Sequence, residues 1–469
     1  MKIAQVSPLY ESCPPQLYGG TERIVYYLTE ELIRLGHEVT LFASGDSRSS
    51  ALLEAGCERA LRLVGTCRDP LIYHLTMLHR VRRRADAFDI IHFHTDYLFP
   101  LFAELANKTL TTLHGRLDLA DLPVVMREFR MMPLVSISAS QTRPLAWANW
   151  YDTVPHGLPR DLYQLGSGGG GYLAFLGRIA PEKGPERAIA IARQARAPLR
   201  MAAKVDPVDR EYFAKVVSPL LHDPLVEFVG EIGDSEKSRF LGEAAALLFP
   251  IEWPEPFGLV LIEAMATGTP VIAFGNGSVP EIVEDGVTGF VVENITEAAA
   301  AVPFARQLDR RAIRKRFEEQ FTAERMARDY LALYRRVLDG RFFDGAGQHD
   351  RPSGRKISFR QPSNRPGKKR REVSSDAPSR RRFAIPHRGE RRNARAAHAD
   401  TKARQYICSR TTQSLLSIWI KSDLHIRSAA PSLRHLRGNR RHTGRGCLHR
   451  GRRVPGVSDA QVAKRRAGH

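Results

Sequence analysis

Apolar and polar residues alternate in blocks along the first part of the chain. Short apolar segments predict buried strands at residues 2–6, 38–43, 89–93, 109–113 and 133–138. Between the first two, residues 21–35 repeat apolar positions at helical spacing, and Gly36 follows as a helix stop. Buried strands that alternate with helices indicate a parallel sheet covered on both faces.

The same alternation restarts after the segment QLGSGGGG. The second series of predicted strands lies at residues 172–176, 199–204, 226–230, 246–250, 270–274 and 289–292. Residues 168–171 are all glycine, which predicts a flexible connection between two units. Residues 310–338 predict one or two amphipathic helices that close the second unit. We therefore expect two α/β domains, 1–160 and 161–340, with a cleft between them.

The composition changes after residue 340. The whole chain has a formal net charge of +20, but residues 341–469 contain 33 basic and 8 acidic residues. The remaining residues are mildly acidic, with 38 basic and 43 acidic side chains. The basic segment is rich in Ser, Arg, Pro, Gly and His, so we expect a largely disordered tail. A frameshifted reading of GC-rich DNA and a genuine basic arm that contacts acidic membrane surfaces are both compatible with it.

Other features of the composition point to an intracellular protein. No apolar run is long enough to span a membrane, and the apolar start at residues 2–6 is too short for a signal peptide. The five cysteines form no C-x-x-C pair and no metal-binding spacing with histidine, so we expect free thiols. Cytoplasmic location is the default expectation, with peripheral contact at the inner membrane face through the tail.

Two glutamates stand eight residues apart in the segment WPEPFGLVLIE. Glu255 lies between two prolines, and a residue before proline is held in extended geometry, so a loop is predicted there. A helix can begin at Phe257–Gly258 and carry Glu263 in its second turn. Three free amides would then lie at the helix start and suit an anion or a hydroxyl: Phe257, Gly258 and Leu259. A solvated loop acid and a surface helix acid remain the alternative interpretation.

A second candidate site is FLGRIAPEKG, which follows a predicted strand and precedes a helix. Arg178 and Lys183 fall on this loop, where open α/β sheets bind ligands. An arginine fork and a lysine point charge suit a diphosphate, although an ordinary solvated loop has the same composition.

Two further positions follow strands of the first domain. Gly19 and Gly20 open the first helix, where glycine lets a ligand approach the backbone closely, although such a pair is often only a turn. His114 ends a buried strand, and a structural histidine is the alternative. His94, Asp96 and His156 are weaker candidates of the same kind.

Together, FLGRIAPEKG, PEPFGLVLIE, AMATGTPVIAF and GSVPEIVEDGVTGFVV resemble the signature of family 4 glycosyltransferases (glycosyl transferase group 1), retaining enzymes with the GT-B architecture. The resemblance covers about residues 1–338. It implies two Rossmann-like domains that face a cleft. It also implies a hexosyltransferase that moves a sugar from a nucleoside-diphosphate sugar to a carbohydrate or other hydroxyl acceptor.

The resemblance also implies roles for individual residues. Glu255 would contact donor-sugar hydroxyls near the anomeric carbon, and Glu263 would bind the donor ribose. Arg178 and Lys183 would hold the diphosphate. His114 would contact the donor sugar. The backbone at Gly19 and Gly20 would face the donor phosphates and the acceptor. The backbone at Gly230 and Glu231 would border the base.

Neither domain contains an Asp-x-Asp motif, so we expect no metal and no separate cofactor, and cations and helix amides would neutralise the leaving group. A sugar-nucleotide 2-epimerase of the same architecture is one alternative function. A non-catalytic sugar-nucleotide binder is another. The tail lacks aromatic residues interleaved with its arginines, so no specific nucleic-acid partner is expected.

Overall fold

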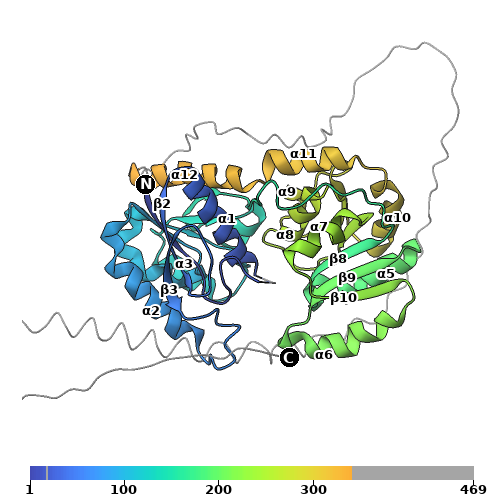
Figure 1. The fold of residues 1–469 in the computed structure, drawn as a ribbon, viewed down its shortest axis with the longest axis horizontal. Coiled ribbons are helices and arrows are strands. Elements are labelled where there is room, and N and C mark those ends of the chain that lie inside the picture. The colour runs from blue at the N-terminus through green and yellow to red at the C-terminus, as the bar shows by residue number, and fades with distance from the viewer. Residues whose placement is uncertain (17–18, 341–469) are drawn as a thin grey trace, which may run out of the picture. The chain divides into compact units, whose positions relative to one another are not determined.

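The computed structural model describes residues 1–16 and 19–340, and within these it contains two parallel sheets (Figure 1). The first has the strand order β3-β2-β1-β4-β5-β6-β7 and the second β10-β9-β8-β11-β12-β13. The strands of the first sheet are β1 Lys2–Val6, β2 Glu38–Ser44, β3 Leu52–Cys57, β4 Ile90–Phe93, β5 Thr109–Thr112, β6 Leu134–Ser136 and β7 Trp150–Thr153. Those of the second are β8 Leu173–Arg178, β9 Leu199–Lys204, β10 Val226–Gly230, β11 Ala246–Phe249, β12 Val271–Phe274 and β13 Gly289–Val292. The predicted fold class is confirmed.

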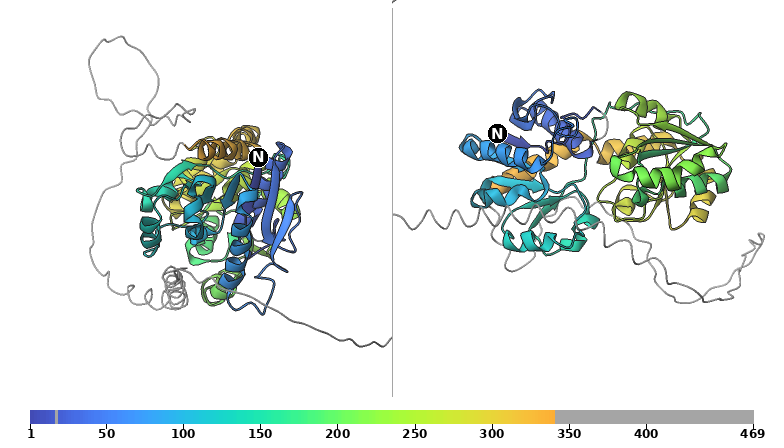
Figure 2. Two further views of the ribbon diagram at one scale, coloured as in Figure 1. Left: turned by 90° about the vertical axis from the view of Figure 1, so that its left-hand side faces the viewer. Right: turned by 90° about the horizontal axis from the view of Figure 1, so that it is seen from below.

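Helices cover both faces of each sheet (Figure 2). They are α1 Gly20–Arg34, α2 Pro70–Arg83, α3 Leu122–Glu128, α4 Ala139–Thr142, α5 Pro185–Ala195, α6 Arg210–Tyr212, α7 Asp234–Gly242, α8 Leu259–Ala266, α9 Val279–Ile282, α10 Ile295–Ala305, α11 Arg310–Gln320 and α12 Ala323–Leu338. In β1, Ile3 packs with α1 on one face, whereas Ala4 and Val6 pack with α2 on the other. Alternating burial on both faces explains why the strands are continuously apolar.

The strands that the apolar pattern did not predict are the two edge strands of the first sheet. β3 and β7 each pair with a single neighbour, β2 and β6. Their residues are mostly half-exposed, so they lack the apolar run that marks a central strand.

The glycine-rich connection is fastened to the second domain, so the expectation of a flexible linker is wrong. The amides of Gly168 and Gly170 donate to the carbonyls of Gly242 and Glu243, each at 2.9 Å. The guanidinium of Arg310 also donates to the carbonyl of Gly166 at 2.9 Å. Glycine is needed because a Cβ at Gly166 would lie 2.1 Å from the carbonyl oxygen of Gly242.

The last helix returns to the first domain. α11 packs on α8 of the second domain, as predicted, but α12 packs on α1 and β5 (Figure 1). Tyr330 and Tyr334 of α12 are completely buried and hydrogen-bond to polar side chains of the first sheet. The expectation that residues 310–338 close the second unit is therefore correct only for α11.

The expectations for residues 341–469, including the basic tail and its membrane contact, lie outside the described residues. Among the residues that are described, no helix is both long and apolar enough to cross a membrane.

Candidate functional site

Both sheets reverse their strand order at a point that lies next to the candidate residues. In the first sheet the order reverses between β1 and β4, and in the second between β8 and β11. Open parallel sheets bind ligands beyond the carboxyl ends of the strands at such a switch point. Gly19 follows β1, His94 follows β4, Arg178 ends β8 and Glu255 follows β11. The topology therefore places residues from separate motifs at the two edges where ligand binding is expected.

Lys183 and Glu255, which belong to different sequence motifs, form one ion pair. The Lys183 Nζ lies 2.5 Å from Glu255 Oε2, and the indole nitrogen of Trp253 donates to the same oxygen at 2.9 Å. The Trp253 ring also lies beneath the ammonium, whose nitrogen is 4.8 Å from the ring centroid. Glu255 is only 9% exposed, so its carboxylate is held in one position by a cation and an aromatic donor.

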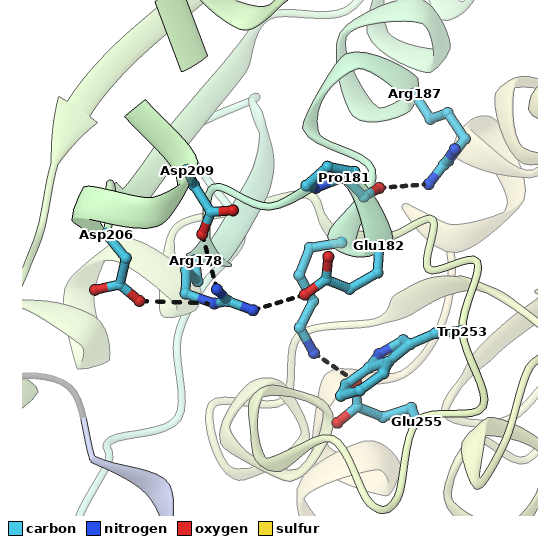
Figure 3. Close-up of polar contacts among 9 residues, drawn as sticks. Arg178, Pro181, Glu182, Arg187, Asp206, Asp209, Trp253 and Glu255 are labelled. Carbon is cyan, nitrogen blue, oxygen red and sulfur yellow. Dashed lines mark hydrogen bonds and ion pairs between the residues drawn. The ribbon is translucent and has the colours of Figure 1, made fainter. Parts of the chain in front are cut away.

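Arg178 is surrounded by carboxylates (Figure 3). Its guanidinium contacts Glu182 at 2.6 Å and Asp209 at 2.8 Å, and its Nε lies 3.8 Å from Asp206. The sequence pattern predicted a pair of cations for a diphosphate. The structure shows that each cation of the pair already has acidic partners, so an entering diphosphate would have to compete with them for Arg178.

Glu263 is a buried residue of α8, so the alternative of a surface helix acid is wrong. It is 4% exposed, and its Oε1 accepts from Lys237 Nζ at 2.9 Å and from Tyr163 Oη at 3.3 Å. Lys237 also lies 3.4 Å from Asp234, which pairs with Arg23 of the first domain. Donors on one oxygen of a buried carboxylate hold it in one orientation.

The start of α8 differs from the prediction. The helix begins at Leu259 with Gly258 as its N-cap, whereas a start at Phe257–Gly258 was expected. Gly258 has φ +83°, a left-handed conformation that favours glycine. Phe257 thus lies outside the helix, where its side chain is buried and its carbonyl accepts from Ser278 Oγ at 2.8 Å. Its amide is therefore not one of the free amides of the helix start.

The loop after β1 approaches the start of α8. Gly19 is the N-cap of α1 and Gly20 is its first residue. A Cβ at Gly20 would lie 3.3 Å from the Leu259 side chain, and one at Gly19 would lie 2.8 Å from Pro15. Two predicted backbone contacts, one from each domain, are therefore neighbours. Glu231 follows β10 and is exposed, as expected for a residue on the rim of a site.

Three histidines from separate strand ends come together. His94 Nδ1 and His114 Nε2 are 2.8 Å apart, and the rings of His114 and His156 stack with centroids 5.1 Å apart. The His156 ring also meets the edge of Phe257, at 4.9 Å. Burial lowers the pKa of His114 to about 3 and the pKa values of His94 and His156 well below the ordinary range. All three rings are therefore neutral near pH 7.

Sequence reasoning missed several residues of the site. The partners of the predicted residues were not identified: Trp253, Lys237, Tyr163, Arg23 and Gln5. Of these only Gln5 had a local hint, because it is the one polar residue of the apolar strand β1 apart from exposed Lys2. Trp253 lies two residues before Glu255, but nothing in the local pattern marks it as a donor to that carboxylate. Lys237, Tyr163 and Arg23 have partners that are remote in the chain.

Comparison with known proteins agrees with this architecture. A sequence profile described as "Glycosyl transferases group 1" matches residues 164–323, and one described as "Glycosyltransferase Family 4" matches residues 18–154. A D-inositol 3-phosphate glycosyltransferase of Mycobacterium leprae is 33% identical over 216 residues, which cover 41% of this chain and 46% of that protein. The chain thus spans about half the length of that relative. The O-antigen chain mannosyltransferase C of Escherichia coli is 24% identical over 374 residues, 72% of this chain and all of that protein.

Solved structures show the same fold at low sequence identity. The sucrose-phosphate synthase of Thermosynechococcus elongatus has a TM-score of 0.59 and 21% identity, and covers 72% of this chain and 99% of its own. An Anabaena protein solved with UDP and glucose has a TM-score of 0.53 and 18% identity, over 71% of this chain and 98% of its own. With each domain matched by its own family profile, the chain belongs to the family 4 glycosyltransferases and has their GT-B fold.

Proposed function

We propose that this protein is a retaining glycosyltransferase that moves a hexosyl group from a nucleoside-diphosphate sugar to a hydroxyl acceptor without a metal ion. The observation that carries the proposal is the Lys183–Glu255 pair beside Arg178. A cation for the leaving diphosphate and a carboxylate for the sugar must lie side by side, because the bond that breaks joins these two parts of the donor.

The charges that develop during transfer fit this arrangement. Cleavage of the donor places negative charge on the diphosphate and positive charge on the sugar. Lys183, Arg178 and the amides at the start of α8 would stabilise the first, and Glu255 the second. In this scheme a phosphate oxygen of the departing group helps to remove the acceptor proton, and the acceptor attacks from the same face.

The donor ribose is assigned to Glu263. A carboxylate accepts hydrogen bonds from two neighbouring hydroxyls, and Lys237 and Tyr163 already occupy Oε1 of Glu263. Within residues 1–16 and 19–340 no hydrogen bond to its Oε2 is found, so this oxygen can accept from the ribose. Gly230 and Glu231, at the end of β10, would border the base.

Ligand-induced thermal shift with UDP-, GDP- and ADP-sugars tests the proposal. One class of nucleotide sugar should raise Tm. At a ligand concentration a hundredfold above Kd, binding should raise the free energy of unfolding by about 2–3 kcal/mol. The shift should survive EDTA. Glu263→Gln should weaken it, whereas Glu319→Gln, an exposed acid on α11, should not.

Two outcomes contradict the proposal. If no nucleotide sugar shifts Tm, the protein does not bind such a donor. Consumption of donor alone with inversion at C2 and no need for an acceptor would identify an isomerase instead. NMR of the product should show that the anomeric configuration of the donor is retained.

A further inference from the structure

A chain of buried hydrogen bonds joins α12 to His114. The amide nitrogen of Gln5 donates to Tyr334 Oη at 3.0 Å, and its oxygen lies 2.8 Å from His94 Nε2. His94 Nδ1 in turn lies 2.8 Å from His114 Nε2. Gln5 and Tyr334 are fully buried, and His94 is 1% exposed, so water does not substitute for any of these contacts.

Gln5 determines which nitrogen of each ring carries the proton. An amide oxygen only accepts, so the facing nitrogen of His94 must carry hydrogen. Because burial keeps His94 neutral, its other nitrogen is bare and accepts from His114 Nε2–H. His114 is neutral for the same reason, so its Nδ1 is bare.

A second branch of the chain is consistent with this assignment. Tyr334 Oη accepts from Gln5 and can therefore donate its own proton to His92 Nδ1 at 2.8 Å. His92 Nε2 then donates to Thr112 Oγ1 at 2.8 Å, and Thr112 donates to Tyr330 Oη at 2.9 Å. Tyr330 is separated from Gln5 by Thr112, His92 and Tyr334, whereas Tyr334 contacts the Gln5 amide directly.

The chain ends on an atom without a partner. Among the described residues, nothing hydrogen-bonds to the buried Nδ1 of His114, and the same holds for Nδ1 of His156, whose side chain is stacked on it. Beyond His156 lies Phe257, two residues after Glu255. Buried polar atoms nearly always have partners, so an acceptor left unpaired beside the sugar-binding loop fits a ligand that donates a hydrogen bond.

We propose that Gln5, His94 and Tyr334 are positioning residues that hold His114 with a bare Nδ1, which accepts a hydrogen bond from a hydroxyl of the donor sugar. The assignment of the hydroxyl to the donor rests on the proposed function. The assignment of the proton positions does not, because it follows from Gln5 and the contacts above.

The experiment compares two tyrosine variants of the full-length protein. Tyr334→Phe removes the group that orients the Gln5 amide, whereas Tyr330→Phe removes an equally buried hydroxyl from the same helix and leaves that amide anchored. Long-range 1H–15N NMR of ring-labelled histidines, without donor, distinguishes a bare from a protonated Nδ1. The His114 signals are assigned by their loss in His114→Gln.

We expect a bare His114 Nδ1 in the wild type and in Tyr330→Phe, and a substantial protonated fraction in Tyr334→Phe. The Kd of the donor found by thermal shift should rise about 3- to 10-fold in Tyr334→Phe, the range for one lost hydrogen bond, and not in Tyr330→Phe.

A protonated Nδ1 in the wild type, or equal effects of the two variants, would overturn the proposal. A changed proton position with an unchanged Kd would overturn the role of Nδ1 as acceptor for the donor. If no nucleotide sugar binds the wild type while the proton positions are as expected, the proposed function fails and the positioning of His114 stands.

Discussion

At the scale of single residues, the site is a set of matched charges. Lys183 neutralises Glu255 at 2.5 Å and Lys237 neutralises Glu263 at 2.9 Å, and both pairs are largely buried. Removing one partner of such a pair leaves a buried charge uncompensated, which is strongly unfavourable. Both carboxylates therefore depend on their lysines for position as well as for charge.

We predict that Lys183→Ala lowers kcat by about 10²–10³, because one electrostatic donor to the leaving group is lost. Arg178→Ala should have a similar effect. Lys215→Ala is the matched control: it removes an equal charge from an exposed i,i+4 pair with Glu211 and should leave the rate unchanged. The measurement is donor turnover at saturation with the acceptor identified by screening. Wild-type turnover in Lys183→Ala would count against the assignment.

At the scale of elements, glycines allow the loop before α8 to fold tightly. Gly277 precedes α9 and has φ +64°, and a Cβ there would lie 2.2 Å from the backbone nitrogen of Glu255. The amide of Ser278 also donates to the carbonyl of Glu255 at 2.9 Å. The turn between β12 and α9 thus supports the backbone of the loop that carries Glu255.

Gly277→Ala should therefore move the Glu255 loop. Gly286→Ala is the control, because Gly286 has φ +73° but nothing within 4 Å of the added Cβ. In both variants, an alanine in the left-handed conformation lowers the free energy of unfolding by about 1 kcal/mol. We expect Gly277→Ala to lower the free energy of unfolding by about 3 kcal/mol or more in total and to weaken donor binding. Equal losses of Tm in the two variants would show that the loop has room to accept the methyl group.

At the scale of the whole molecule, the two domains meet through specific contacts. Ser138 Oγ donates to the carbonyl of Pro256 at 2.6 Å, and the amides of Ala139 and Ser140 donate to Glu281, each at 2.7 Å. On α12, the tyrosines bring the end of the described chain back to the first sheet. His92 hydrogen-bonds to Tyr334 of α12, and His156 packs against Phe257 of the second domain, so protonation of these histidines would disturb contacts of the first domain with both.

Acid should destabilise the protein more steeply than its exposed groups would predict. Burial lowers the folded pKa of His92, His94, His114 and His156 below the ordinary 6.5, so the unfolded chain binds more protons as pH falls. The contribution of these histidines to the free energy of unfolding is therefore fully present above about pH 6.5 and falls below it, by up to about 1.4 kcal/mol per histidine per pH unit.

Thermal unfolding between pH 7 and 5 measures this effect. His156→Phe keeps an aromatic ring against Phe257 and removes one titrating group, so its Tm should fall less steeply with acid than that of the wild type. An identical pH dependence in the two proteins would contradict neutral burial of His156.

The accuracy of the sequence-based prediction followed the range of the interactions. The central strands 2–6 and 199–204 were predicted to the residue, because a strand covered on both faces is apolar by itself. The edge strands 226–230 and 289–292 were also predicted to the residue, because their core-facing side chains are apolar. The start of α8 was predicted two residues too early, because its N-cap depends on the left-handed Gly258 and on the packing of Phe257. The role of α12 was missed, since nothing in its amphipathic pattern tells which sheet it covers.

The sequence by itself determined the strand and helix order, the two α/β units and the motifs that carry the candidate chemistry. These depend on local properties: apolar periodicity, proline geometry and short spacings between residues. Only the tertiary structure decided that Lys183 pairs with Glu255, that acids surround Arg178, and that Gln5 and Tyr334 reach His114. Apart from Arg178–Glu182, those contacts join residues far apart in the chain. They exist because parallel strands bring their carboxyl ends to a common edge and because α12 packs back on the first domain.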